Sequence, residues 1–325
     1  MMNATATSVS PKESQKEKEE EEQVTLLLVD IQKDFHPGGS LAIPTANEDS
    51  HRVATLIKTH QSKIKRVVAT MDSHLKLHIA NPGFWVSGEE DENHTNDCNK
   101  KRRHPDPFTV ITSQDIANGK WKPRDNLYIP PGTIDSNIFG SLESLTKDHH
   151  PSNPRYLDLT KYAMEYTKRL EDSGKFQLVV WPEHCLVGSV GFSMVDEVME
   201  ALQEWSETTG GSIEWVLKGQ NLLTESYSAL EAEVPVNQAT SLNKSVIASL
   251  TTSDRLLICG QAMSHCVHYT TANLVHHWPK DKLSNITLLT DCASSVPGFE
   301  AAGDKFQDDM AKAGVLLKKS TEVFS

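Results

Sequence analysis

The stretch VTLLLVD at residues 24–30 decides the fold class. It is a short, continuous apolar run, which is typical of a strand buried on both faces of a parallel sheet. Similar runs recur at residues 66–71, 177–181, 213–217, 255–259 and 286–290, and a short last edge strand is expected at 315–318. Helical patterns lie between them, at residues 47–60, 192–205, 242–250, 266–278 and 300–313. Strands that alternate with helices predict an α/β protein with a parallel sheet and helices on both of its faces.

Two segments lie outside this alternation. Residues 1–23 end in the run KEKEEEEQ and contain too little apolar surface to offset the entropy of ordering, which predicts a disordered acidic tail. Residues 86–176 are polar and contain several prolines, and this segment is longer than a compact crossover between two strands needs. Within them, Leu159, Tyr162, Ala163, Tyr166 and Leu170 share one face of a helix that Gly174 would end. We therefore expect one domain over residues 24–325, with an insertion at about 86–176.

Composition excludes several classes of function. The 325 residues hold 32 Lys and Arg against 44 Asp and Glu, a net charge of −12, which argues against binding nucleic acid through its phosphates. No apolar run approaches the ~18 residues of a membrane-spanning helix, and the first residues lack the apolar core of a secretory signal. Five cysteines without a C-x-x-C pair fit neither a disulfide framework nor a zinc ribbon. We expect a cytoplasmic protein, with the nucleus as an alternative compartment. We expect it to bind a small molecule, and a homo-oligomer is a further possibility.

Charged and metal-binding side chains follow the predicted strands. In parallel sheets ligands bind beyond the carboxyl ends of the strands, so these positions are where chemistry is expected. Asp72 and His74 follow the second run and point to one side of an extended segment, and His184 follows the third. One carboxylate and two imidazoles suit a catalytic zinc or iron site with open positions. The alternative is that each histidine is an ordinary hydrogen-bonded residue.

A candidate nucleophile opens a helix after the fifth run. Cys266 lies at that helix N-terminus, and Lys218 ends the fourth run; both settings favour a thiolate. Asp30, after the first run, could accept the thiol proton, and a turn over residues 260–266 could aim backbone N–H groups at an oxyanion. The alternative is a buried core cysteine, a turn-forming aspartate and a solvated lysine.

Aromatic side chains complete a predicted pocket. Phe35 and Trp181 follow or close strands on the same side, and Tyr227 lies nine residues past Lys218. Two such rings could sandwich a flat heteroaromatic substrate. Each could equally be ordinary packing.

Five segments together resemble a known family. LLLVDIQKDFHPGGSLAIP, TMDSHLKLH, WPEHCLVGSVG, KGQNLLTESYSAL and CGQAMSHCVHYT, in this order, resemble the nicotinamidase branch of the isochorismatase-like cysteine hydrolases. The resemblance covers roughly residues 24–85 and 177–320. It implies a Rossmann-like three-layer sandwich with a mostly parallel six-stranded sheet, the isochorismatase-like hydrolase fold.

The resemblance also assigns roles to residues. It implies a triad of Cys266 as nucleophile, Asp30 as proton acceptor and Lys218, with the Ala262 and Cys266 amides as oxyanion donors after a cis Gln261–Ala262 bond. Its metal ligands fall on Asp72, His74, His78 and His184, which would hold one divalent ion, with zinc preferred and iron or manganese as alternatives. That ion would bind the pyridine nitrogen, and Phe35 and Trp181 would stack on the ring.

The implied activity is hydrolysis of nicotinamide to nicotinate and ammonia through a thioester, a step of NAD salvage. Three departures from the family pattern bear on the substrate and the ligands. Ser264 stands where the family has Asp, the stretch IANPGFW after His78 differs from the expected Ser-Phe pair, and the insertion has no counterpart in compact nicotinamidases. There are two alternatives: a hydrolase that acts on another small amide or carbamoyl group, and a non-catalytic scaffold.

Overall fold

The computed structural model describes residues 21–88, 103–142, 145–147 and 156–325. The predicted disordered tail, apart from its last three residues, lies outside the described residues, as do Cys98 and parts of the insertion.

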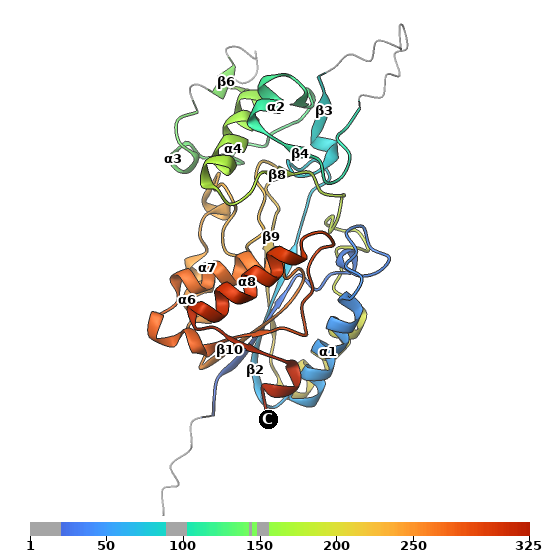
Figure 1. Cartoon of the computed structure of the whole chain (residues 1–325), viewed down its shortest axis with the longest axis vertical. Coiled ribbons are helices and arrows are strands. Elements are labelled where there is room, and N and C mark those ends of the chain that lie inside the picture. The colour runs from blue at the N-terminus through green and yellow to red at the C-terminus, as the bar shows by residue number, and fades with distance from the viewer. Residues whose placement is uncertain (1–20, 89–102, 143–144, 148–155) are drawn as a thin grey trace, which may run out of the picture.

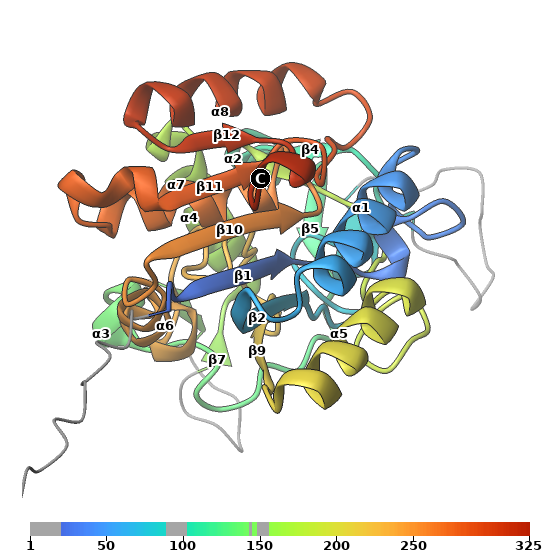
Figure 2. The ribbon, with the colours of Figure 1, turned by 90° about the horizontal axis from the view of Figure 1, so that it is seen from below.

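Six parallel strands form the central sheet, in the order β12-β11-β10-β1-β2-β9. They are β1 (Val24–Val29), β2 (Ile64–Asp72), β9 (Ile213–Lys218), β10 (Arg255–Gly260), β11 (Ile286–Leu289) and β12 (Leu316–Lys318). The strand that decided the fold class, β1, lies in the middle, and all six of its residues are buried. Figure 2 shows the strands side by side, with β12 and β9 at the two edges. The predicted α/β class and parallel sheet are confirmed.

One predicted strand does not belong to this sheet. In residues 177–181 only Leu178–Val179 form a strand, β8, which pairs antiparallel with β4 (Val110–Ile111) of the insertion. The sixth strand of the sheet is instead β12, from the segment expected to add only a short last edge. A short apolar run shows that a segment is buried, but it does not show which partner buries it.

Helices cover both faces of the sheet and make three layers (Figures 1 and 2). On one face, α1 (Ala46–Thr59) and α5 (Asp196–Thr209) pack against the side chains of Leu26 and Leu28. On the other, Leu27 and Val29 pack against a second set of helices: α6 (Lys244–Leu250), α7 (Cys266–His277) and α8 (Glu300–Ala313). Successive side chains of β1 point to opposite faces of the sheet, so this strand packs against both helical layers. Short 3₁₀ turns occupy Lys33–Phe35, Pro82–Phe84, Gln238–Thr240, Lys280–Asn285 and Ser320–Glu322.

The insertion lies at one end of the molecule, at the top of Figure 1. Its elements are β3 (Trp85–Ser87), β4, α2 (Ser113–Ala117), β5 (Trp121–Pro123), α3 (Ser136–Phe139), β6 (Thr146–Lys147), β7 (Tyr156–Leu157) and α4 (Leu159–Ser173). The predicted helix is α4, and Gly174 ends it with a positive φ of 66°. At its start, the Asp158 carboxylate accepts the N–H groups of Thr160 and Lys161, a typical N-cap.

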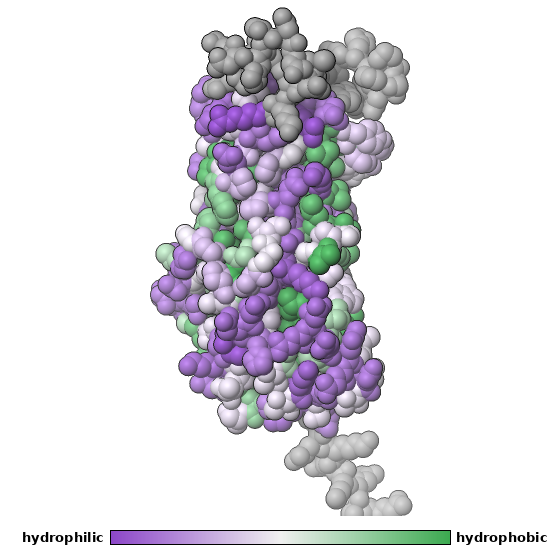
Figure 3. Space-filling view, turned by 90° about the vertical axis from the view of Figure 1, so that its right-hand side faces the viewer, coloured by the Kyte–Doolittle hydropathy of each residue, from purple (hydrophilic) through white to green (hydrophobic). Residues whose placement is uncertain are grey.

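The insertion shares an apolar cluster with the main domain. Tyr162 and Tyr166 of α4 are fully buried in the cluster that also holds Phe35, Trp181 and Tyr227. On the side of the molecule in Figure 3, hydrophilic residues cover the lower part and hydrophobic ones gather at mid-height. Among the described residues, no helix combines the length and apolar character needed to cross a membrane.

Candidate active site

Three strand ends bring charged side chains together. Asp30 directly follows β1, and Asp72 and Lys218 are the paired last residues of β2 and β9. The Lys218 Nζ atom lies 3.0 Å from Asp30 Oδ2 and 3.0 Å from Asp72 Oδ1, and all three side chains are buried. The Lys218 ammonium also donates to the Ser226 carbonyl oxygen at 3.0 Å. A buried cation therefore lies between two buried carboxylates.

The charges in this cluster depend on one another. Burial alone would lower the pKa of Lys218, but Asp30 and Asp72 raise it well above its usual value. Burial would raise the pKa of Asp72, but His74, Lys218 and His184 hold it well below its usual value. Burial does raise the pKa of Asp30, against the opposing charge of Lys218. Lys218 and Asp72 are therefore charged, and Asp30 is the carboxylate best suited to take up a proton.

Cys266 is the first residue of α7, and its side chain is buried beside this cluster. Asp30 and Lys218 are near enough to its thiol to act on the pKa of that group in opposite directions. Burial raises the pKa of the thiol well above its usual value, and Lys218 offsets only part of this. The sequence favoured a readily formed thiolate here, whereas in the folded protein desolvation outweighs Lys218 and favours the protonated thiol.

The two backbone amides that the resemblance implies as oxyanion donors are those of Ala262 and Cys266. The Gln261–Ala262 peptide bond is cis, as the resemblance implied. Among the described residues no acceptor is found for the Ala262 N–H, and the Cys266 amide belongs to the first turn of α7, where N–H groups have no acceptor within the helix. The Gln261 side chain is buried and fixed, since its Nε2 donates to Asp49 Oδ2 at 2.9 Å.

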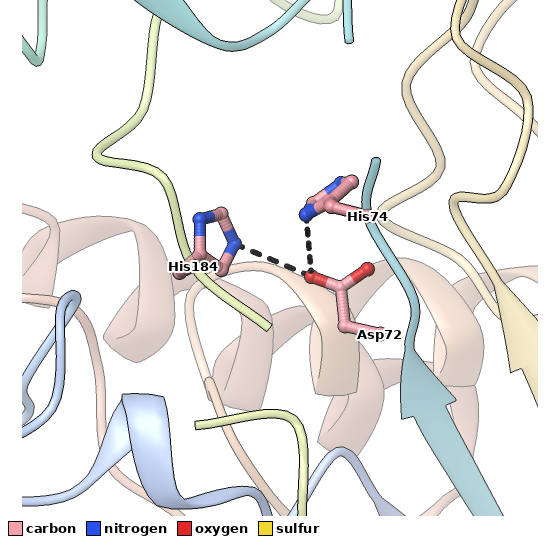
Figure 4. A group of neighbouring side chains, drawn as sticks. All are labelled: Asp72, His74 and His184. Atoms are coloured by element: carbon pink, nitrogen blue, oxygen red, sulfur yellow. Dashed lines mark ion pairs between the residues drawn. The ribbon is translucent and has the colours of Figure 1, made fainter. Parts of the chain in front are cut away.

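A second group of side chains has the geometry of metal ligands (Figure 4). Asp72 Oδ2 lies 3.5 Å from His74 Nδ1 and 3.3 Å from His184 Nε2. Two ligands of a tetrahedral zinc, each ~2.0–2.1 Å from the ion, are themselves roughly 3.3–3.4 Å apart. The His74 Nδ1 atom is buried and has no hydrogen-bond partner among the described residues. The three side chains therefore fit a divalent cation.

The ring orientation of His184 also suits a ligand. Its Nδ1 lies 2.7 Å from the Pro182 carbonyl oxygen. Since a carbonyl only accepts, Nδ1 carries the hydrogen, and Nε2 is left with its lone pair toward Asp72. Gly219, with φ +76°, leaves room beside the cluster, because a Cβ there would lie 2.9 Å from Asp72 Oδ1.

His78, the fourth ligand that the resemblance implied, is placed differently. Its Nε2 donates to the Thr224 carbonyl oxygen at 2.9 Å, and its Nδ1 accepts the Ala80 N–H at 3.2 Å. Burial, followed by the charge of His74, lowers the pKa of this imidazole to about 4. His78 groups with His74 and Glu225, and not with Asp72 and His184.

Sequence reasoning missed Glu225. This side chain is buried, and its Oε1 lies 3.3 Å from His74 Nε2. Burial would lower the pKa of His74, but Asp72 and Glu225 raise it to about 9. Glu225 lies within the segment KGQNLLTESYSAL, but it follows no strand directly, so the strand-end rule did not select it.

These groups line one cavity with about 350 Å³ of empty space. Its walls contain every predicted site residue except Asp30 and His78, and add Leu41, Glu225, His265 and Val296. The predicted aromatic wall is present: Trp181 Nε1 donates to the Tyr227 hydroxyl at 3.0 Å, and Phe35 lies edge-on to His184. The cavity is therefore the candidate site for a small ligand.

The fold, with its six-stranded parallel sheet, is shared with solved structures of amide hydrolases. More narrowly, the solved structures that it resembles are nicotinamidases. The structure of the yeast nicotinamidase bound to the inhibitor nicotinaldehyde matches with a TM-score of 0.54 and 19% identity, over 91% of this chain and 100% of that one. A nicotinamidase–pyrazinamidase of Acinetobacter baumanii matches with a TM-score of 0.52 and 17% identity, over 93% and 98%. No protein-family model matches the sequence, and no curated protein does.

Proposed function

We propose that this protein is a metal-binding cysteine amidohydrolase that converts nicotinamide and water to nicotinate and ammonia, a step of NAD salvage. One observation carries the proposal: a thiol, its proton acceptor and a buried lysine converge at a small aromatic cavity beside three candidate metal ligands. The fold shared with nicotinamidases supports the choice of substrate.

The residues would act in sequence. Cys266 Sγ attacks the amide carbon while Asp30 takes the thiol proton, and the carbonyl oxygen, now negative, accepts the Ala262 and Cys266 N–H groups. Asp30 returns the proton to the leaving nitrogen, so the C–N bond breaks and ammonia departs from a thioester. Asp30 then takes a proton from water as the water oxygen attacks the thioester carbon. The C–S bond breaks to give the acid, and the leaving sulfur takes the proton back from Asp30 to restore the thiol. Lys218 stays protonated throughout, and its positive charge compensates the negative charge of the Asp30 carboxylate.

The aromatic side chains and the metal ligands would position the substrate. Phe35, Trp181 and Tyr227 would hold the flat ring, and Asp72, His74 and His184 would hold a divalent ion, for which zinc is preferred and iron or manganese are alternatives. When bound, the ion would supply a Lewis-acidic contact for the ring nitrogen of the substrate.

The test is release of ammonia and nicotinate from nicotinamide by the purified, metal-loaded protein. Benzamide, which lacks the ring nitrogen, is the matched comparison, and it is expected to be a much poorer substrate. Hydrolysis of other small amides or carbamoyl compounds, with none from nicotinamide, would keep the reaction class and replace the substrate. No hydrolysis of any of them would favour a non-catalytic scaffold.

Metal binding is expected to depend on His184. The purified protein should bind one divalent ion and gain thermal stability from it, and the His184→Ala variant should lose both. Elemental analysis and unfolding curves with and without added Zn²⁺ measure these effects. His51→Ala, at an exposed histidine paired with Glu197, is the control and should bind normally. The His78→Asn variant should retain the ion, since both nitrogens of His78 contact the backbone; loss of the ion there would restore His78 to the ligand set.

A further inference from the structure

The two ring nitrogens of His74 lie in different surroundings. Nδ1 faces Asp72 and has no hydrogen-bond partner among the described residues, whereas Nε2 faces Glu225 Oε1 at 3.3 Å. Figure 4 shows the Nδ1 side of the ring directed at the carboxylate that also meets His184. If Nε2 carries the hydrogen and donates it to Glu225, Nδ1 is left with a lone pair for an ion. The opposite tautomer would aim an N–H group at that ion.

Glu225 is itself held from several directions. Its side chain is 3% exposed, and its Oε1 also accepts the Ser226 N–H at 2.8 Å. The next carbonyl along, that of Ser226, accepts from the Lys218 ammonium. The carboxylate is thus fixed against His74.

The insertion supplies the remaining support. The Tyr166 hydroxyl of α4 accepts the Glu225 N–H at 3.0 Å, and the Tyr162 hydroxyl donates to the Leu223 carbonyl oxygen at 2.6 Å. Both tyrosines are fully buried and lie one helical turn apart, so they present their hydroxyls to one loop. Helix α4 therefore contacts the backbone that carries Glu225.

We propose that Glu225 is a positioning residue of the metal centre, and that helix α4 of the insertion holds it in place through Tyr166 and Tyr162. Glu225 accepts the Nε2 hydrogen of His74 and fixes the direction of its ring, so that Nδ1 is the nitrogen that faces the ion. Carboxylates that accept the second N–H of a ligating histidine act in this way at many metal sites. The inference rests on the proposed metal site of Asp72, His74 and His184, and it gives the insertion a role at that site.

The test is the affinity for Zn²⁺, measured by competition with a chromophoric chelator on the full chain. Glu225→Ala is expected to weaken binding by about 10–100-fold, the usual effect of losing such a partner. Glu225→Gln keeps an acceptor but removes the charge, and should fall between Glu225→Ala and the wild type. Tyr166→Phe removes one hydrogen bond to the loop and should weaken binding about fivefold.

Matched controls separate positioning from general damage. Glu233→Gln changes another glutamate of the same loop, one that is partly buried and belongs to neither group of candidate metal ligands, and it should bind Zn²⁺ normally. Tyr128→Phe, at a residue 76% exposed, should do the same. Circular dichroism of the metal-free variants should match the wild type.

The outcomes are distinct. Weak binding by both Glu225 variants, with normal controls, supports the proposal. Wild-type affinity in a folded Glu225→Gln or Glu225→Ala variant, while His184→Ala loses the ion, overturns the positioning role and leaves the metal site standing. Absence of binding by the wild-type chain overturns the metal site and the positioning role together. Normal binding by Tyr166→Phe and Tyr162→Phe overturns the role of the insertion.

Discussion

Replacing Cys266 with alanine is expected to abolish ammonia release from nicotinamide, by roughly 10⁴-fold or more in kcat. The loss follows from the proposed chemistry, because without the sulfur no thioester forms, and the Asp30 carboxylate has no thiol proton to accept. The fold should survive, because the change removes one atom from a small buried side chain at the start of α7.

Rates of ammonia release should be compared at saturating substrate, with unfolding curves recorded for each variant. Cys259→Ala is the matched control: Cys259 is also buried, on the neighbouring strand β10, but its sulfur faces the Leu27 carbonyl oxygen and not the cavity. It should retain turnover. A folded Cys266→Ala variant with wild-type activity would remove Cys266 from the mechanism.

The sequence was sufficient to place the charged cluster, for a physical reason. Asp30, Asp72 and Lys218 each stand at the end of an apolar run, and parallel strands bring such ends to one edge of the sheet. The match between Asp72 and Lys218 in register then sets the 3.0 Å contact. Helix α8 was likewise predicted with its observed bounds, Glu300–Ala313, because its apolar face is regular.

The features that the sequence did not predict depend on contacts between segments that are distant along the chain. Residues 177–181 have the composition of a core strand, yet their partner is a strand of the insertion. The role of Glu225 comes from His74, 151 residues away, and from Tyr166 on an inserted helix. Neither spacing nor periodicity reports such pairings. The raised pKa of Cys266 has the same origin, because desolvation depends on every segment that covers the thiol.

Replacing Lys218 with methionine is expected to lower the free energy of unfolding by about 3–5 kcal/mol in metal-free protein, and to abolish activity. Methionine fills much of the same space, so the effect would come from charge: Asp30 and Asp72 would remain buried with no ammonium between them. The carbonyl oxygen of Ser226 would also lose its donor.

Urea denaturation in the presence of a chelator measures this effect, because a bound cation would itself balance Asp72. Lys65→Met is the matched control: Lys65 lies on β2, but its partner Glu21 is 77% exposed, and such a surface pair contributes at most about 1 kcal/mol. Adding Zn²⁺ should recover part of the stability of Lys218→Met, since the ion restores positive charge beside Asp72, whereas activity should stay lost because Asp30 still lacks its partner. Equal stability of Lys218→Met and the wild type in chelator would mean that one of the two carboxylates is already protonated, and Asp30, whose pKa burial raises, would be that group.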